Sequence, residues 1–146
     1  MAKEYFEEWM SAAMSRFKLA NVAIKEGLLK DAAFDLHQTI ERLYHCALLV
    51  CTFYTPHSHN IAFLRTHAER LDRHLLIWPM DSRKDRATFE KLKDAYVKAR
   101  YSRHYKITIE ELTWLAERIK ELGQAVHAVC AERIAALEAA AQGAAA

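Results

Sequence analysis

Residues that interrupt helices are scarce in this sequence, which contains only three glycines and two prolines among 146 residues. These two residue types are the least favourable in a helix interior, so their scarcity favours long helices over a fold rich in turns. There is no run of roughly 18 apolar residues, which argues against a membrane-spanning helix. The chain does not open with the pattern of a secretory signal, and we expect a cytoplasmic protein that does not associate with membranes.

The sequence also has few cysteines and little net charge. The three cysteines, Cys46, Cys51 and Cys130, form no Cys-x-x-Cys pair, and we interpret them as small core residues. A formal net charge of +2 is too small to indicate nucleic acid or a membrane by itself. Glycine-rich phosphate loops and Ser/His/Asp arrangements are absent, so the sequence gives no support for common hydrolase or kinase chemistry. We predict neither a resident metal nor a cofactor.

Apolar residues are plentiful: 52% of the chain is hydrophobic and 27% is charged, a composition typical of a compact globule. They recur at alternating steps of three and four, the spacing of one face of a helix. The predicted helices cover residues 6–24, 31–53, 59–75, 83 to beyond 100, and from about 109 onward. We expect the second of these helices to be the most buried.

Local signals mark the ends of these helices. Gly27 ends the first helix, and Pro56 lies in a loop after the second because proline lacks a donor and restricts the preceding residue. Ser82 is a suitable N-cap for the fourth helix. Thr108 and Glu111 form a capping-box pattern, in which each side chain satisfies a free backbone N–H at the start of the last helix.

Four long helices and one short one, joined by brief loops, predict an all-α fold. The simplest arrangement is an antiparallel up-and-down four-helix bundle with an additional short helix. We assign residues 1–138 to a single domain. The alanine-rich residues 139–146 are expected to fray or be disordered.

The fourth helix and the residues after it are rich in basic side chains. Nine basic residues and three acidic residues lie between positions 83 and 106. Clustered guanidinium and ammonium groups attract phosphates, which indicates a phosphate-bearing partner. A solvated helix face is the competing interpretation of the charge alone.

The second helix carries polar residues on a side that must help to pack the fold. His37, Glu41 and His45 are spaced four apart, so they share a face that could in principle hold Zn²⁺. We prefer a polar layer facing the fourth helix, because buried polar groups need partners. Glu41 and Arg100 are the predicted pair, with His37 and Gln38 beside them.

Three segments together resemble HEPN domains. Residues 32–49 read AAFDLHQTIERLYHCALL, which is similar to the second helix of that family. Residues 56–60, PHSHN, and residues 94–101, DAYVKARY, resemble its third and fourth helices in order and spacing. The resemblance covers roughly residues 4–137. It implies a helical bundle that forms homodimers and is paired with, or fused to, a minimal nucleotidyltransferase.

Catalytic HEPN ribonucleases carry an Arg and a His separated by four to six residues. Here only three residues separate Arg100 from His104, and the longer spacing begins at Lys98. An uninterrupted helix would still place Arg100 and His104 on one face. His104 could then move a proton and Arg100 could stabilise a phosphate without a metal.

The resemblance and the basic segment together predict a binding domain for nucleotide or RNA phosphate that acts with a minimal nucleotidyltransferase. The alternatives are a metal-independent ribonuclease, such as the toxin of a toxin–antitoxin pair, and a dimerisation scaffold without ligand. Tyr105 could also be modified by the partner, or it could simply close the end of the bundle. Besides the candidate catalytic pair Arg100 and His104, the predicted ligand-binding residues are His37, Gln38, Glu41, Lys98, Tyr101, Arg103 and Tyr105.

Overall fold

The computed structural model describes residues 1–145, and Ala146 lies outside the described residues. Over that range the chain is helical and contains no strand, which confirms the predicted all-α class. The elements are α1 (Ala2–Lys25), α2 (Leu29–Thr52), α3 (Ile61–Glu69), the short 3₁₀ helix η1 (Arg73–Leu75), α4 (Arg83–Tyr101) and α5 (Ile109–Ala145).

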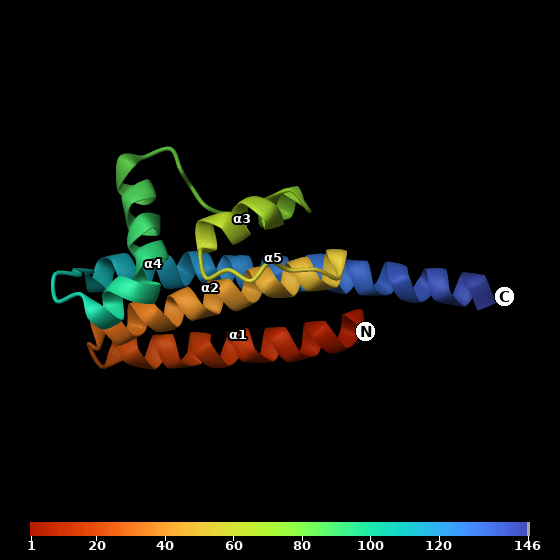
Figure 1. Cartoon of the computed structure of the whole chain (residues 1–146), viewed down its shortest axis with the longest axis horizontal. Helices are drawn as coiled ribbons and strands as arrows, with labels where there is room; N and C mark the ends of the chain where they lie inside the picture. The colour runs from red at the N-terminus through yellow and green to blue at the C-terminus, as the bar shows by residue number, and fades with distance from the viewer. Residues whose placement is uncertain (146) are drawn as a thin grey trace.

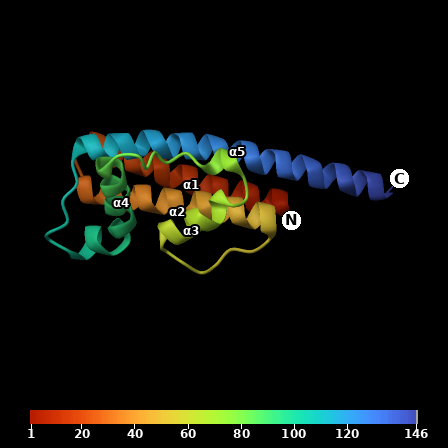
Figure 2. The ribbon, with the colours of Figure 1, turned by 90° about the horizontal axis from the view of Figure 1, so that it is seen from above.

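The helices do not form the simple antiparallel bundle that we predicted. Figure 1 shows α1, α2 and α5 lying along the long axis, with α2 and α5 running in the same direction and α1 opposite to both. In the same view and from above (Figure 2), α4 stands across these helices. The stripe that α4 buries is narrow and includes the small residues Ala95 and Ala99. A narrow stripe is enough for α4 to contact helices that it crosses. It offers too little apolar surface for α4 to pack along the whole length of a neighbouring helix.

Helix α2 is the centre of the fold, as predicted. It contacts α1, α3, α4 and α5, and every residue from 36 to 41 is buried. Leu36, Ile40 and Leu43 are fully buried in the core that all the helices share. The buried stretch also contains polar side chains, which need hydrogen-bond partners from other elements.

The predicted caps are present. Gly27 follows α1 with a φ of +74°, a conformation that glycine adopts without strain. Ser82 Oγ accepts a hydrogen bond from the Asp85 backbone N–H at 3.0 Å. Thr108 and Glu111 form the reciprocal capping box, with distances of 3.0 and 3.1 Å. Local sequence therefore fixes these helix ends.

The third predicted helix is shorter than the expected range of residues 59–75. Asn60 caps α3, because its side chain accepts hydrogen bonds from the backbone N–H groups of Ala62 and Phe63. Asp72 then accepts from the His74 backbone N–H and starts η1 as a separate turn. The two caps divide the apolar pattern into two elements and leave His59 in the preceding loop.

Helix α5 continues through Ala145, and its last turns extend past the N-terminus of α1 (Figure 1). The fraying that we expect for residues 139–146 stays a prediction, and its last residue lies outside the described range. Among the described helices, none combines the length and the apolar content that a membrane span requires.

Candidate functional site

The carboxylate of Glu41 organises a buried polar cluster on α2. Its Oε1 accepts a hydrogen bond from His59 Nδ1 at 2.7 Å, and its Oε2 accepts one from Gln38 Nε2 at 2.9 Å. His45 Nε2 lies 3.8 Å from Oε1. We call Glu41, Gln38, His37, His45 and His59 the Glu41 network. The prediction that Glu41 pairs with Arg100 is wrong, because His45, His59 and the Gln38 amide surround the carboxylate.

Glu41 is buried as an anion. Burial alone would raise its pKa, but the neighbouring His45 and His59 outweigh that effect and hold the pKa below its usual value. The carboxylate is therefore ionised at neutral pH and accepts hydrogen bonds only. It follows that His59 donates its Nδ1 proton to Glu41, which leaves Nε2 as the second functional atom of that ring.

His37 is a neutral member of the same network. Its Nε2 donates to the His59 backbone carbonyl at 3.0 Å, and its Nδ1 accepts from Gln38 at 3.3 Å. Burial lowers the pKa of His37 to about 4, so the ring is uncharged at neutral pH. The ring thus fixes the loop backbone at His59. Within residues 1–145, no group of three suitable side chains that could hold a metal ion is present.

His59 connects the network to the surface. Its side chain is 59% exposed, and its ring lies flat on the ring of Tyr96 in α4, with centroids 4.2 Å apart and planes 10° apart. It also lines two hollows. One, of about 500 Å³, includes Trp9 and Arg42; the other, of about 300 Å³, includes Lys93 and Lys98.

His59 was not among the predicted site residues. It lies in the PHSHN segment that contributed to the resemblance, but no spacing in the sequence relates it to Glu41, 18 residues earlier. By contrast, His37, Gln38 and Glu41 lie in one polar layer, as predicted.

Arg100 lies at the surface beside this network. Its Nε donates to the Tyr96 backbone carbonyl at 2.8 Å. Its guanidinium carbon lies 4.7 Å from the ring centroids of Phe34 and Tyr96 and 5.0 Å from that of Tyr101. In the described part of the chain, no carboxylate lies within 4.0 Å of this guanidinium to neutralise it. The aromatic rings hold the cation in place but leave its charge uncompensated.

The predicted helical pairing of Arg100 with His104 does not form. Helix α4 ends at Tyr101, and Ser102 is extended, with φ −101° and ψ 119°. Ser102 Oγ then accepts from the His104 backbone N–H at 3.2 Å. The chain turns after Ser102, so His104 is exposed and does not continue the face that carries Arg100.

Tyr105 is buried, which agrees with the second of its two predicted roles, closing the end of the bundle, and not with modification by a partner. Its side chain is 8% exposed, and its hydroxyl donates to the Lys91 backbone carbonyl at 2.7 Å. Burial raises its pKa well above the usual range, so the hydroxyl stays protonated. Tyr105 therefore closes the end of the helical core, and its hydroxyl does not face a ligand.

Comparison with known families adds to this geometry. The family model described as HEPN domain matches residues 6–133, a range that contains both the Glu41 network and Arg100. The chain belongs to the HEPN domain family. No curated protein matches it.

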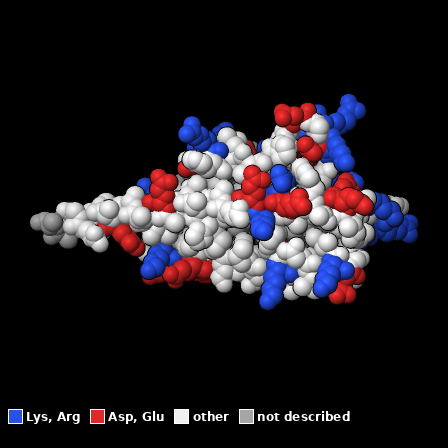
Figure 3. Space-filling model, turned by 180° about the vertical axis from the view of Figure 1, so that it is seen from behind, with Lys and Arg blue, Asp and Glu red and all other residues white. Residues whose placement is uncertain are grey.

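The basic residues of this HEPN domain are not one continuous surface. Three lysines in α4 are paired with carboxylates: Lys91 with Glu111, Lys93 with Glu90 and Lys98 with Asp94, at 2.9 to 3.2 Å. On the face shown in Figure 3, basic and acidic side chains are interspersed. The middle of α4 is therefore an ion-paired face, which agrees better with the interpretation as a solvated helix face than with a phosphate-binding one.

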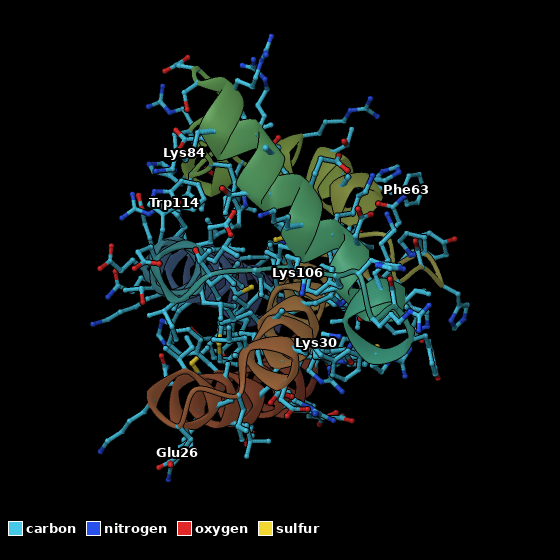
Figure 4. The ribbon with its side chains drawn as sticks, turned by 90° about the vertical axis from the view of Figure 1, so that its left-hand side faces the viewer. Glu26, Lys30, Phe63, Lys84, Lys106 and Trp114 are labelled. Carbon is cyan, nitrogen blue, oxygen red and sulfur yellow. The ribbon has the colours of Figure 1, made fainter. Side chains whose placement is uncertain are left out.

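Basic residues that have no acidic partner within residues 1–145 gather at the C-terminal end of α4. Lys30 Nζ donates to the Ser102 carbonyl at 3.1 Å, which brings the start of α2 to this end. Figure 4 shows Lys30 and Lys106 together there, with Lys84 toward the opposite end of α4. We call Lys30, Arg100, Arg103 and Lys106 the α4-end cluster. Tyr101, 76% exposed, lies beside Arg100 in the same region.

Proposed function

We propose that this HEPN domain binds the phosphate groups of RNA or a nucleotide at the C-terminal end of α4. The observation that carries the proposal is the Arg100 guanidinium, held against aromatic rings and without an acidic partner among the described residues. A guanidinium offers several N–H donors in a plane and suits bidentate contacts to phosphate. The other three cations of the cluster add sequence-independent attraction.

An exposed aromatic ring supports a nucleic-acid ligand over free phosphate. Tyr101 is 76% exposed and touches the same guanidinium that would hold the phosphate. Nucleic-acid-binding proteins commonly stack unpaired bases on such rings. We therefore favour single-stranded RNA, with Lys98 as an additional cation that can exchange Asp94 for a phosphate.

Salt-dependent RNA binding tests this proposal. Fluorescence anisotropy of a labelled single-stranded RNA should give at least a tenfold weaker Kd for Arg100→Ala combined with Arg103→Ala, which corresponds to about 1.4 kcal/mol or more. The slope of log Kd against log salt should fall by about 1.4, because two phosphate contacts are lost. The matched control is Arg83→Ala with Lys84→Ala at the other end of α4. Equal loss in both double variants would contradict a specific site.

We also propose that this domain acts as a homodimer with a minimal nucleotidyltransferase. Both ideas come from the resemblance to HEPN domains, and the family match over residues 6–133 supports the domain assignment on which they rest. An apolar hollow of about 540 Å³ between α1 and α5, lined by Met10, Met14 and Phe17, offers surface for a second copy. Sedimentation at several protein concentrations tests the dimer, and co-purification with a nucleotidyltransferase encoded beside this chain tests the partner.

The geometry does not favour the ribonuclease mechanism that uses Arg100 with His104. The helix ends between them, and the His104 ring has no hydrogen-bond partner among the described residues that would orient it. Proton transfer requires a positioned imidazole. His59, by contrast, is oriented by its hydrogen bond to Glu41.

A further inference from the structure

We propose that Cys51 is a site of reversible oxidation, at which hydrogen peroxide joins its thiol to that of Cys130 in a disulfide between α2 and α5. The observation that carries the proposal is a group of three free thiols, in which that of Cys130 adjoins those of both Cys46 and Cys51. Cys51 lies at the opposite end of α2 from Lys30, so the site is separate from the α4-end cluster and independent of the proposed RNA binding.

The two thiols meet where the end of α2 packs on α5. Cys51 is the penultimate residue of α2, and this end of the helix lies alongside α5 (Figure 1). Cys51 lines a surface hollow together with Val129 and Arg133, which lie on either side of Cys130 in α5. The lining of the hollow therefore also places Cys51 against the turn of α5 that carries Cys130. Close thiols on two packed helices meet the main geometric requirement for a disulfide.

The cysteines differ in their access to solvent, which assigns their order of reaction. Cys46 and Cys130 have no exposed surface, whereas Cys51 is partly exposed and opens into the hollow, whose volume is about 370 Å³. A small peroxide that enters the hollow therefore meets the Cys51 sulfur first. The buried Cys130 thiol behind it then acts as the resolving group.

The proposed oxidation has two steps. The Cys51 sulfur attacks one oxygen of hydrogen peroxide, the oxygen–oxygen bond breaks, and the leaving hydroxide takes the thiol proton, which gives a sulfenic acid and water. The Cys130 sulfur then attacks the Cys51 sulfur, the sulfur–oxygen bond breaks, and the departing hydroxide takes the Cys130 proton. Overall, two thiols and one peroxide become one disulfide and two water molecules. A dithiol reductant reverses the change by thiol–disulfide exchange.

The surroundings of Cys51 make this oxidation slow. The neighbouring Cys130 thiol and burial raise the pKa of Cys51. Among the charged residues that line the hollow, Arg133 opposes this rise and Asp72 adds to it, and Glu132 is the third. Because the thiolate is the reactive form, little of the residue is reactive at neutral pH. The site therefore responds to sustained exposure to peroxide and not to a brief pulse.

A disulfide at this position restrains much of the chain. The bond between Cys51 and Cys130 closes a loop of residues 52–129, which contains α3, η1 and α4. Closing a long loop removes conformations from the unfolded chain and so favours the folded state. We therefore expect the oxidised domain to resist unfolding more strongly than the reduced one.

The test compares the whole chain treated with excess hydrogen peroxide and with dithiothreitol, by intact mass, alkylation of free thiols and peptide mapping. The oxidised parent should lose two hydrogen atoms, and the linked peptides should contain Cys51 and Cys130. Its Tm should rise by about 4 °C or more and return to the starting value on reduction. Cys51→Ser should form no disulfide. The matched control is Cys46→Ala, which removes the other neighbour of Cys130 and should still form the same link.

Circular dichroism checks that both variants fold, and the peptide map of the parent decides the pairing independently of them. A Cys46–Cys130 link in the parent or in Cys51→Ser would overturn the assignment of Cys51. Oxidation of Cys51 to a sulfinic acid without any link would show that Cys130 does not resolve it. A disulfide between two chains, seen on a non-reducing gel in place of the internal one, would likewise contradict the proposal.

Discussion

The Glu41 network and the α4-end cluster both contact Tyr96, and they differ in how far the protein itself satisfies their polar groups. The carboxylate of Glu41 has protein donors on both oxygens. Arg100 has aromatic faces and one backbone carbonyl, but no anion within the described chain. The first region therefore contributes to packing at the α2–α4 crossing, whereas the second carries a charge that no carboxylate of the described residues neutralises. Substitutions should therefore affect stability in one and binding in the other.

Removing the Glu41 carboxylate should have the largest effect on stability. Glu41→Ala leaves the donors of Gln38 and His59 without their acceptor, and charge-assisted hydrogen bonds of this kind contribute about 1.5–3 kcal/mol. We expect the free energy of unfolding in urea to fall by about 2–3 kcal/mol. Glu90→Ala is the control, because its ion pair with Lys93 is exposed and should contribute less than about 1 kcal/mol. Similar losses in both variants would contradict the distinction.

Acid should weaken the Glu41 network before it affects the α4-end cluster. The folded-state pKa of His37, about 4, lies below its ordinary value of 6.5, so between these values the unfolded chain binds a proton that the folded chain does not. The contribution of His37 is fully present above pH 6.5 and is lost as the pH falls toward 4. From pH 7 to pH 5 the free energy of unfolding should decrease by about 2 kcal/mol through this residue.

Urea unfolding at a series of pH values checks this expectation. Glu41, whose pKa is also lowered, acts in the same direction only below about pH 4.5. The variant His37→Gln should show a much smaller change between pH 7 and pH 5. An unchanged pH dependence in that variant would show that His37 does not cause it.

Tyr105 provides the smallest expected effect and tests where the exposed cluster ends. Tyr105→Phe removes the hydroxyl that donates to the Lys91 carbonyl, which should cost about 1 kcal/mol in a thermal or urea unfolding experiment. RNA binding should stay unchanged, because the hydroxyl faces the core. If Tyr105→Phe weakened RNA binding while leaving stability intact, the boundary that we draw between Tyr101 and Tyr105 would be misplaced.

Sequence patterns predicted those parts of the fold that depend on neighbours in the chain. The caps at Ser82, Thr108 and Glu111 were recognisable because N-cap hydrogen bonds join residues two to three positions apart. The apolar spacing likewise identified α2 as the buried helix. The crossing of α4 was not predictable in this way, because helix periodicity gives the width of an apolar stripe but not the direction of the helix that it contacts.

The candidate site was predicted only in part for the same reason. Grouping Glu41 with His37 and Gln38 required only helix geometry, and the structure confirms it. The partner across the helix interface was assigned to Arg100 on charge alone, whereas the loop residue His59, whose ring stacks on Tyr96, reaches the carboxylate. Charge complementarity predicts that a buried anion has a partner, but packing determines which residue reaches it.

The Tyr96 ring is shared between the two regions, since His59 stacks on it and Arg100 lies 4.7 Å from its centroid. A substitution at Tyr96 therefore changes the surroundings of the His59 imidazole and of the Arg100 guanidinium at the same time. Through this one aromatic residue, the packing of the buried network and the placement of the exposed cation are coupled.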